Sequence, residues 1–166
     1  MNIVVRTFIL LLAIAAGGIP ARAQSPSSIV GTWRLVSMDR EVLETKVVSH
    51  AFGGHAVGLL TYTSDGRMMV MIVDSTRKPP AQPTATDAEA LGLYRTMLAY
   101  AGPYRVQANE VITHVELSWD QTLTGTDQKR FFKLEGNRLT ITSTPLVSAF
   151  LGNQTTVTTL VWERVT

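Results

Sequence analysis

Apolar and polar positions alternate with a period of two through most of the chain, which is the pattern of half-buried β-strands. The first clear segment runs from Ile29 to Met38, and the last runs from Thr158 to Val165 and is rich in β-branched and aromatic residues. One face of the first segment carries Gly31, Trp33, Leu35 and Ser37. A first and a last strand of similar character predict a sheet that closes on itself.

The segments between these two strands are joined by short turns, as in an antiparallel meander. Asp65-Gly66 between two strand-like segments is the strongest hairpin signal in the sequence. We expect an all-β fold of roughly eight to ten strands, which suits a closed barrel with room for side chains or one small ligand. The expected segments after the first are residues 42–48, 57–63, 67–73, 104–107, 111–119, 126–134, 138–143 and 155–165.

One stretch changes from strand to helix periodicity. Thr86 and Glu89 form the pattern of a capping box, which typically marks the start of a helix. Apolar residues then follow at helical spacing, and Gly102-Pro103 is a typical stop signal. The stripe consists of Leu91, Tyr94, Met97, Leu98, Tyr100 and Ala101. We therefore expect one mid-chain helix that ends before Gly102 and either covers one end of the barrel or lies along its wall.

The first residues have the features of a cleavable export signal. Arg6 precedes an apolar run from Phe8 to Ala16, and Ala21-Arg22-Ala23 provides a small-x-small cleavage site. The run is about half of the roughly 20 residues that a membrane-spanning helix needs. We therefore expect cleavage after Ala23, a mature domain over residues 24–166, a periplasmic or secreted location, and no stable membrane anchor after cleavage.

Charge and cysteine content narrow the class of function. Residues 1–23 contain two basic residues and no acidic ones, so 13 of the 15 basic residues remain against 13 acidic residues. A nearly neutral chain without a basic cluster argues against nucleic acid as a partner. The sequence has no cysteine, which excludes disulfides and thiolate chemistry. His50 and His55 match no zinc motif, so we expect no metal and no cofactor.

Several motifs occur in an order that resembles the bacterial lipocalin-like domain family of the calycin superfamily. They are Gly31-Thr32-Trp33, Tyr62 to Met68, Tyr100 to Tyr104, His114-Val115-Glu116, Gly125 to Gln128, and Val161 to Val165. The resemblance implies a closed lipocalin-like barrel over the mature chain, with Gly31, Trp33 and Arg164 as residues that close it. In the related cytoplasmic fatty-acid-binding proteins, an Arg-x-Tyr on the final strand holds the ligand carboxylate. Leu160 and Trp162 occupy those positions here, so that site is not carried over.

A candidate polar cluster lies on the strands that flank residues 120–124. Lys129 and Lys133 share one face of the second strand and are expected in water, which turns Gln128 and Arg130 toward the interior. A buried arginine needs partners because an unpaired buried charge is costly. If the loop runs from Asp120 to Thr124, antiparallel pairing sets Glu116 opposite Gln128 and His114 opposite Arg130.

This register depends on the length of the loop, and a slip by one residue would scatter the cluster. The other face of the first strand is more apolar and competes for the interior. It carries Val111, Val115, Leu117 and Trp119. In that case His114 and Glu116 would point to solvent.

We interpret the chain as a binder of a small hydrophobic or amphipathic molecule. The predicted ligand-binding residues are His114, Glu116, Gln128, Arg130, Tyr62 and Tyr104. An alternative is a lipocalin-like isomerase, cyclase or hydrolase, with His114 and Glu116 as acid and base and Arg130 as oxyanion partner. A third alternative is a structural module of the cell envelope without a ligand. The sequence does not define an oligomeric state.

Overall fold

The computed structural model describes residues 28–148 and 153–165. The predicted signal peptide and cleavage site lie outside the described residues. The strands are β1 (Gly31–Val42), β2 (Val48–His50), β3 (Ala56–Tyr62), β4 (Arg67–Asp74), β5 (Met97–Gln107), β6 (Glu110–His114), β7 (Leu117–Ser118), β8 (Asp127–Glu135), β9 (Arg138–Ser143), β10 (Leu146–Ser148) and β11 (Gln154–Arg164). The helices are η2 (Ala51–Gly54), α1 (Asp87–Arg95) and η3 (Gln121–Leu123).

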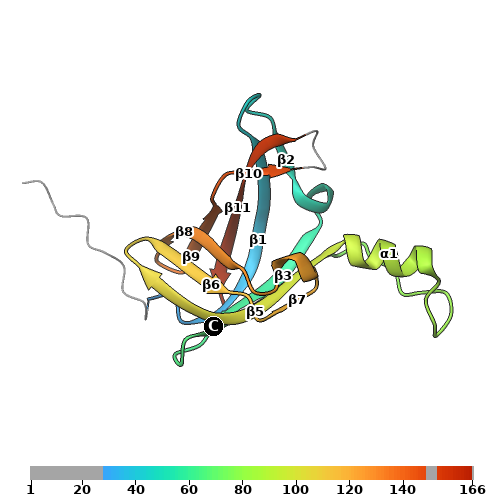
Figure 1. Ribbon diagram of the computed structural model, residues 1–166, viewed down its shortest axis with the longest axis horizontal. Coiled ribbons are helices and arrows are strands. Elements are labelled where there is room, and N and C mark those ends of the chain that lie inside the picture. The colour runs from blue at the N-terminus through green and yellow to red at the C-terminus, as the bar shows by residue number, and fades with distance from the viewer. Residues whose placement is uncertain (1–27, 149–152, 166) are drawn as a thin grey trace, which may run out of the picture.

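Eight of the strands form a closed antiparallel barrel, as the sequence predicted (Figure 1). Their order around the ring is β1-β3-β4-β5-β6-β8-β9-β11, and β11 pairs back onto β1. The closing pair is long, extending from Trp33 opposite Arg164 to Val42 opposite Thr156. β2, β7 and β10 pair at the margins of this ring.

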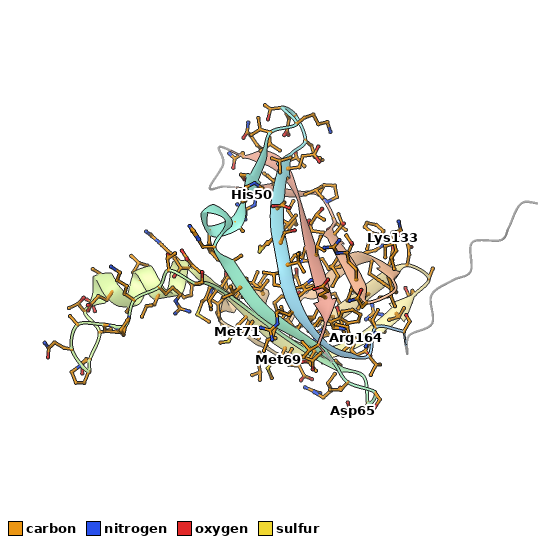
Figure 2. All side chains as sticks on the ribbon, turned by 180° about the vertical axis from the view of Figure 1, so that it is seen from behind. His50, Asp65, Met69, Met71, Lys133 and Arg164 are labelled. Carbon is orange, nitrogen blue, oxygen red and sulfur yellow. The ribbon has the colours of Figure 1, made fainter. Side chains whose placement is uncertain are left out.

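The barrel interior is filled from alternate positions of the strands. On β4 the odd-numbered Met69 and Met71 are exposed while Met68, Val70 and Ile72 are buried. Trp33 and Trp162 are the largest fully buried side chains and come from the two strands that close the ring. Met69 and Met71 therefore lie on the outside of the barrel (Figure 2).

A β-bulge in β1 changes which residues of that strand face inward. Leu35 is opposite Trp162 and Ser37 is opposite Val161, so Val36 is an extra residue in the ladder. Before the bulge, the odd-numbered Trp33 and Leu35 point inward, and beyond it the even-numbered residues point inward. Val42 is buried there, and Met38 and Arg40 face the interior.

The Asp65-Gly66 hairpin prediction is confirmed. Tyr62 pairs with Met68, and the Thr63 amide donates to the Arg67 carbonyl across the turn. Gly66 has φ +84°, a left-handed conformation that glycine adopts without a Cβ penalty.

The mid-chain helix exists but is shorter than predicted. The capping box is present, since the Thr86 hydroxyl accepts from the Glu89 amide and the Glu89 carboxylate accepts from the Thr86 amide. However, α1 ends at Arg95, and β5 begins at Met97. Gly102 and Pro103 lie within β5 rather than at a helix end. The error arose because Leu98 and Tyr100 fit a period of two as well as a helical stripe.

α1 projects away from the barrel (Figure 1). It contains no buried residue, and Leu91 and Tyr94 are exposed. The expectation that it covers a barrel end or lies along the wall is therefore wrong. Across the described ranges, none of the helices combines the length and the hydropathy needed to cross a membrane.

Candidate functional site

The predicted pairing of the two strands around residues 120–124 is wrong by three residues. His114 is opposite Asp127, and Arg130 is opposite Val111. An odd shift exchanges the two faces of one strand relative to its neighbour. Gln128 and Arg130 therefore face inward as predicted, whereas His114 and Glu116 lie outside the barrel and the four residues do not form one cluster.

The shift results from a longer connection than expected. The last contacts between the two strands join Val115 to Thr126 and Gly125. The chain then turns toward β5, where the Glu116 amide donates to the Ala101 carbonyl and β7 pairs with Tyr100 and Ala101. Residues 116–125 thus connect the strands, instead of a loop over residues 120–124.

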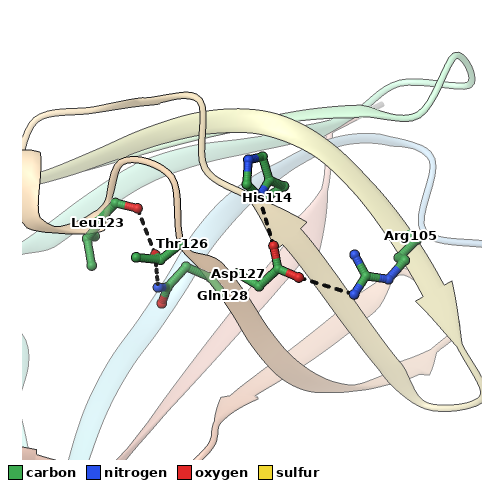
Figure 3. A network of polar contacts seen from close by, with 6 residues as sticks. All are labelled: Arg105, His114, Leu123, Thr126, Asp127 and Gln128. Carbon is green, nitrogen blue, oxygen red and sulfur yellow. Dashed lines mark hydrogen bonds and ion pairs between the residues drawn. The ribbon is translucent and has the colours of Figure 1, made fainter.

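On the outer face, His114 joins a small polar network (Figure 3). Its Nδ1 lies 2.9 Å from Oδ1 of Asp127, and an Arg105 guanidinium nitrogen lies 3.2 Å from Oδ2. The hydrogen bond from His114 and then that from Arg105 lower the pKa of Asp127 below its ordinary value. About half of each of the three side chains is exposed, so this network is a solvated surface feature.

Glu116 also has an outer partner. Its carboxylate forms an ion pair with the guanidinium of Arg67 at the start of β4, and both side chains are about half exposed. Exposed ion pairs of this kind contribute little to stability. His114 and Glu116 are therefore satisfied at the surface and separated by the barrel wall from Arg130.

The interior holds a cavity of about 180 Å³. Most of its lining is apolar, and the polar lining residues come from several strands. The apolar lining consists of Met38, Leu60, Met68, Val70, Ile72, Leu98, Val111, Ile141, Leu146, Leu160 and Trp162, and the more polar lining consists of Arg40, Tyr62, Tyr100, Thr113, Arg130, Ser143 and Thr158.

Four of the polar residues form a row across adjacent strands of the wall. Arg40 on β1 is opposite Thr158 on β11, and Arg130 on β8 is opposite Ser143 on β9. The Thr158 amide donates to the Ser143 hydroxyl at 3.0 Å, which joins the two pairs. Because neighbouring strands are about 4.8 Å apart, the row spans about 14 Å of the wall.

Within this row, Arg130 is held by neutral acceptors. Its guanidinium donates to the Lys129 carbonyl at 2.7 Å and to Oε1 of Gln128 at 3.0 Å. The Gln128 amide in turn donates to the Thr126 hydroxyl at 2.9 Å. Gln128 therefore orients Arg130 but does not line the cavity itself.

The tyrosines occupy different places. Tyr62 and Tyr100 line the cavity, and burial raises the pKa of each phenol above its ordinary value. Tyr104 packs edge-on against Tyr62, with ring centroids 4.8 Å apart, and its hydroxyl donates to the Thr63 carbonyl. Tyr104 thus supports Tyr62 from outside the cavity.

Trp162 contributes an unused donor. The residue lines the cavity and is 1% exposed, and its buried Nε1 has no hydrogen-bond partner among the described residues. Buried Trp nitrogens usually find an acceptor, so this nitrogen is an unsatisfied buried donor of a residue that lines the cavity.

The residues predicted to close the barrel come together where the last strand meets the first, and Figure 2 labels Arg164 there. The Arg164 guanidinium lies over the Trp33 indole, with Cζ 4.1 Å from the ring centroid, and donates to the carbonyls of Val30 and Ser28. Gly31 has φ +134°, and a Cβ on it would lie 2.5 Å from an Arg164 nitrogen. Glycine at this position therefore makes room for the guanidinium.

Sequence reasoning missed Arg40 as a cavity residue. One sequence feature could have revealed the bulge in β1: Leu35 and Val42 are an odd number of positions apart, so one uninterrupted strand cannot bury both on the same face.

The described residues contain no group of three or more His, Cys, Asp or Glu side chains able to hold a metal ion.

A family model described as a lipocalin-like domain matches residues 30–165, which is most of the chain. A search of curated proteins found no match.

Proposed function

Because the chain belongs to the lipocalin-like domain family, we propose that it binds a small, largely apolar molecule inside the barrel. The single observation that carries this proposal is the interior cavity of about 180 Å³ with its predominantly apolar lining. Ligand sites are typically concave and apolar, with a few polar groups that fix the orientation of the ligand. Here Arg40, Arg130 and Tyr62 supply such groups.

The size of the cavity limits the ligand. An apolar cavity of about 150 Å³ binds one benzene molecule, whereas sites for drug-sized ligands are roughly 300–1,000 Å³. The enclosed part of the ligand is therefore small, comparable to a ring or a short alkyl chain.

The residues that the enzyme alternative requires do not lie together. It required His114 and Glu116 as acid and base beside Arg130, but both are exposed on the outer face while Arg130 lines the cavity. A general base must come within hydrogen-bond reach of the proton it abstracts. The third alternative, a module without a ligand, predicts a filled interior, and the cavity favours binding over it.

We also propose a location for the protein on the basis of the predicted export signal. The apolar run and the Ala21-Arg22-Ala23 site favour a periplasmic or secreted protein whose mature chain begins at Gln24. Measuring the N-terminus of protein from its own host tests this. A mature chain that still contains residues 1–23 would contradict it.

The binding proposal is tested by filling the cavity. Leu98 lines it and is partly exposed, so Leu98→Trp adds bulk where some rearrangement is tolerated. Leu59→Trp is the matched control because Leu59 is exposed on the outer face of β3. Calorimetric titration with a panel of neutral and charged eight-carbon ligands should show saturable binding to the wild-type chain and to Leu59→Trp.

Leu98→Trp should weaken binding of any ligand in the panel that binds the wild-type chain. Leu160→Trp provides a second filled variant, because Leu160 also lines the cavity and is partly buried. Binding that is unaffected in both folded variants, or no binding by any member of the panel, would overturn the proposal.

A further inference from the structure

We propose that the ligand is an anionic amphiphile whose head group binds between Arg130 and Arg40 while its short apolar tail fills the remaining cavity. This inference rests on the proposed function and names the chemical class of the ligand. It concerns two arginines on β8 and β1, not the final-strand site of the fatty-acid-binding proteins.

The first argument is the charge of the cavity wall. Two arginines line the cavity, and its lining contains no Asp or Glu. In contrast, the outward-facing Arg67 and Arg105 form ion pairs with Glu116 and Asp127. No ion pair within residues 28–148 and 153–165 involves Arg40 or Arg130.

An arginine that is partly buried on a largely apolar cavity wall favours an anion. The guanidinium is always protonated and has five N–H donors, and Arg130 uses them on two neutral oxygens. Removing a charge from water without a counter-charge is costly. A bound anion would supply that counter-charge and accept bidentate hydrogen bonds.

The second argument is the surplus of donors. Arginine and tryptophan side chains only donate hydrogen bonds, and the buried Nε1 of Trp162 has no partner in the described chain. The nearby phenols of Tyr62 and Tyr100 remain neutral because burial raises the pKa of each. They therefore supply no negative charge. A ligand that brings several acceptor oxygens complements this wall.

The third argument is the arrangement of polar and apolar lining. Arg40, Thr158, Ser143 and Arg130 form the continuous row on β1, β11, β9 and β8. The facing strands β3 and β4 present an almost entirely hydrocarbon wall, which consists of Leu60, Met68, Val70 and Ile72 with Tyr62. This division matches a molecule with one charged end and one apolar end.

The test compares three probes that share an eight-carbon tail: octanoate, 1-octanol and octylammonium. Calorimetric titration of the wild-type chain at neutral pH should give the tightest binding for octanoate. Hydrogen bonds to charged groups contribute about 1.5–3 kcal/mol, so the preference over 1-octanol should be about tenfold to a hundredfold.

Substitutions of the two arginines test whether they cause the preference for octanoate. Arg130→Met and Arg40→Met should each weaken octanoate binding by about tenfold or more and leave 1-octanol binding nearly unchanged. Arg130→Lys should retain part of the preference because it keeps the charge. Arg34→Met is the matched control, since Arg34 is exposed on the outer face of the same strand as Arg40.

The outcomes separate the two proposals. Equal binding of octanoate and 1-octanol that is lost in Leu98→Trp would overturn the anionic ligand and leave the binding function intact. A preference for octylammonium, or octanoate binding that resists both arginine variants, would also overturn it. Failure of all three probes to bind would overturn the binding function as well.

Discussion

The guanidinium of Arg164 lies over the indole ring of Trp33, 4.1 Å from its centroid, at the pair where the last strand of the barrel meets the first. The same guanidinium donates to two backbone carbonyls of the segment that precedes β1. The Trp33 Nε1 donates to the Ile29 carbonyl in the same segment. These contacts hold the last strand, the first strand and the segment before β1 together where the barrel closes.

Replacing Arg164 should therefore destabilise the fold. Arg164→Met removes a cation–π contact and two charge-assisted hydrogen bonds, so we expect a loss of about 2–4 kcal/mol in the free energy of unfolding. Urea denaturation measures this loss. Arg34→Met on the outer face of β1 should change stability by less than about 0.5 kcal/mol, and an equal loss in the two variants would contradict the assigned role.

Gly102 on β5 lies close against the backbone at the end of β6, and a residue with a side chain would not fit there. A Cβ at this position would lie 1.8 Å from the His114 carbonyl oxygen, a backbone atom that cannot move without breaking strand pairing. Gly102→Ala should lower the free energy of unfolding by at least about 3 kcal/mol.

Gly92→Ala is the matched control for that substitution. A Cβ at Gly92 in α1 meets nothing within 4 Å, and alanine is favoured over glycine in helices by up to about 1 kcal/mol. Thermal unfolding should show a lower midpoint for Gly102→Ala and an unchanged or higher midpoint for Gly92→Ala. A small effect at Gly102 would contradict the close packing of β5 against the end of β6.

The outer network predicts a pH dependence. The pKa of Asp127 is lower in the folded chain than its ordinary value, because His114 and Arg105 stabilise the carboxylate. The folded state then binds fewer protons there than the unfolded state, so the contribution of Asp127 to stability is present above the ordinary Asp pKa of about 3.9. It is lost as the pH falls through the folded value.

Comparison of the wild-type chain with Asp127→Asn isolates this effect. The difference between their unfolding midpoints should be largest at neutral pH and shrink below about pH 4. Lys133→Met on the same strand serves as an exposed control for surface substitution. A difference that grows toward acid pH would have the wrong sign and would contradict the assignment.

The fold could be predicted from the sequence because its strongest signals are local. Asp65-Gly66 specifies a hairpin, and the alternation around Lys129 and Lys133 correctly turns Arg130 inward. The length of α1 was overestimated because residues 97–101 also suit a strand. Pairing of Val73 through Met69 with Met97 through Ala101 outweighs their helical spacing.

The site could be predicted only in part because it depends on two register details. Residues 116–125 determine the position of His114 relative to Arg130. Their contacts with β5 produce no recognisable pattern in the local sequence. The inward orientation of Arg40 depends on the bulge at Val36. A single extra or missing residue reverses a whole strand face, so such details require the three-dimensional pairing.

The most direct test of the account is native mass spectrometry of the protein purified from its own host. We predict one small molecule bound per chain of the wild type and of Leu59→Trp, released on denaturation, and missing from folded Leu98→Trp. The ligand-free mass alone in the wild type, or the same bound molecule in Leu98→Trp, would contradict a ligand site inside the barrel.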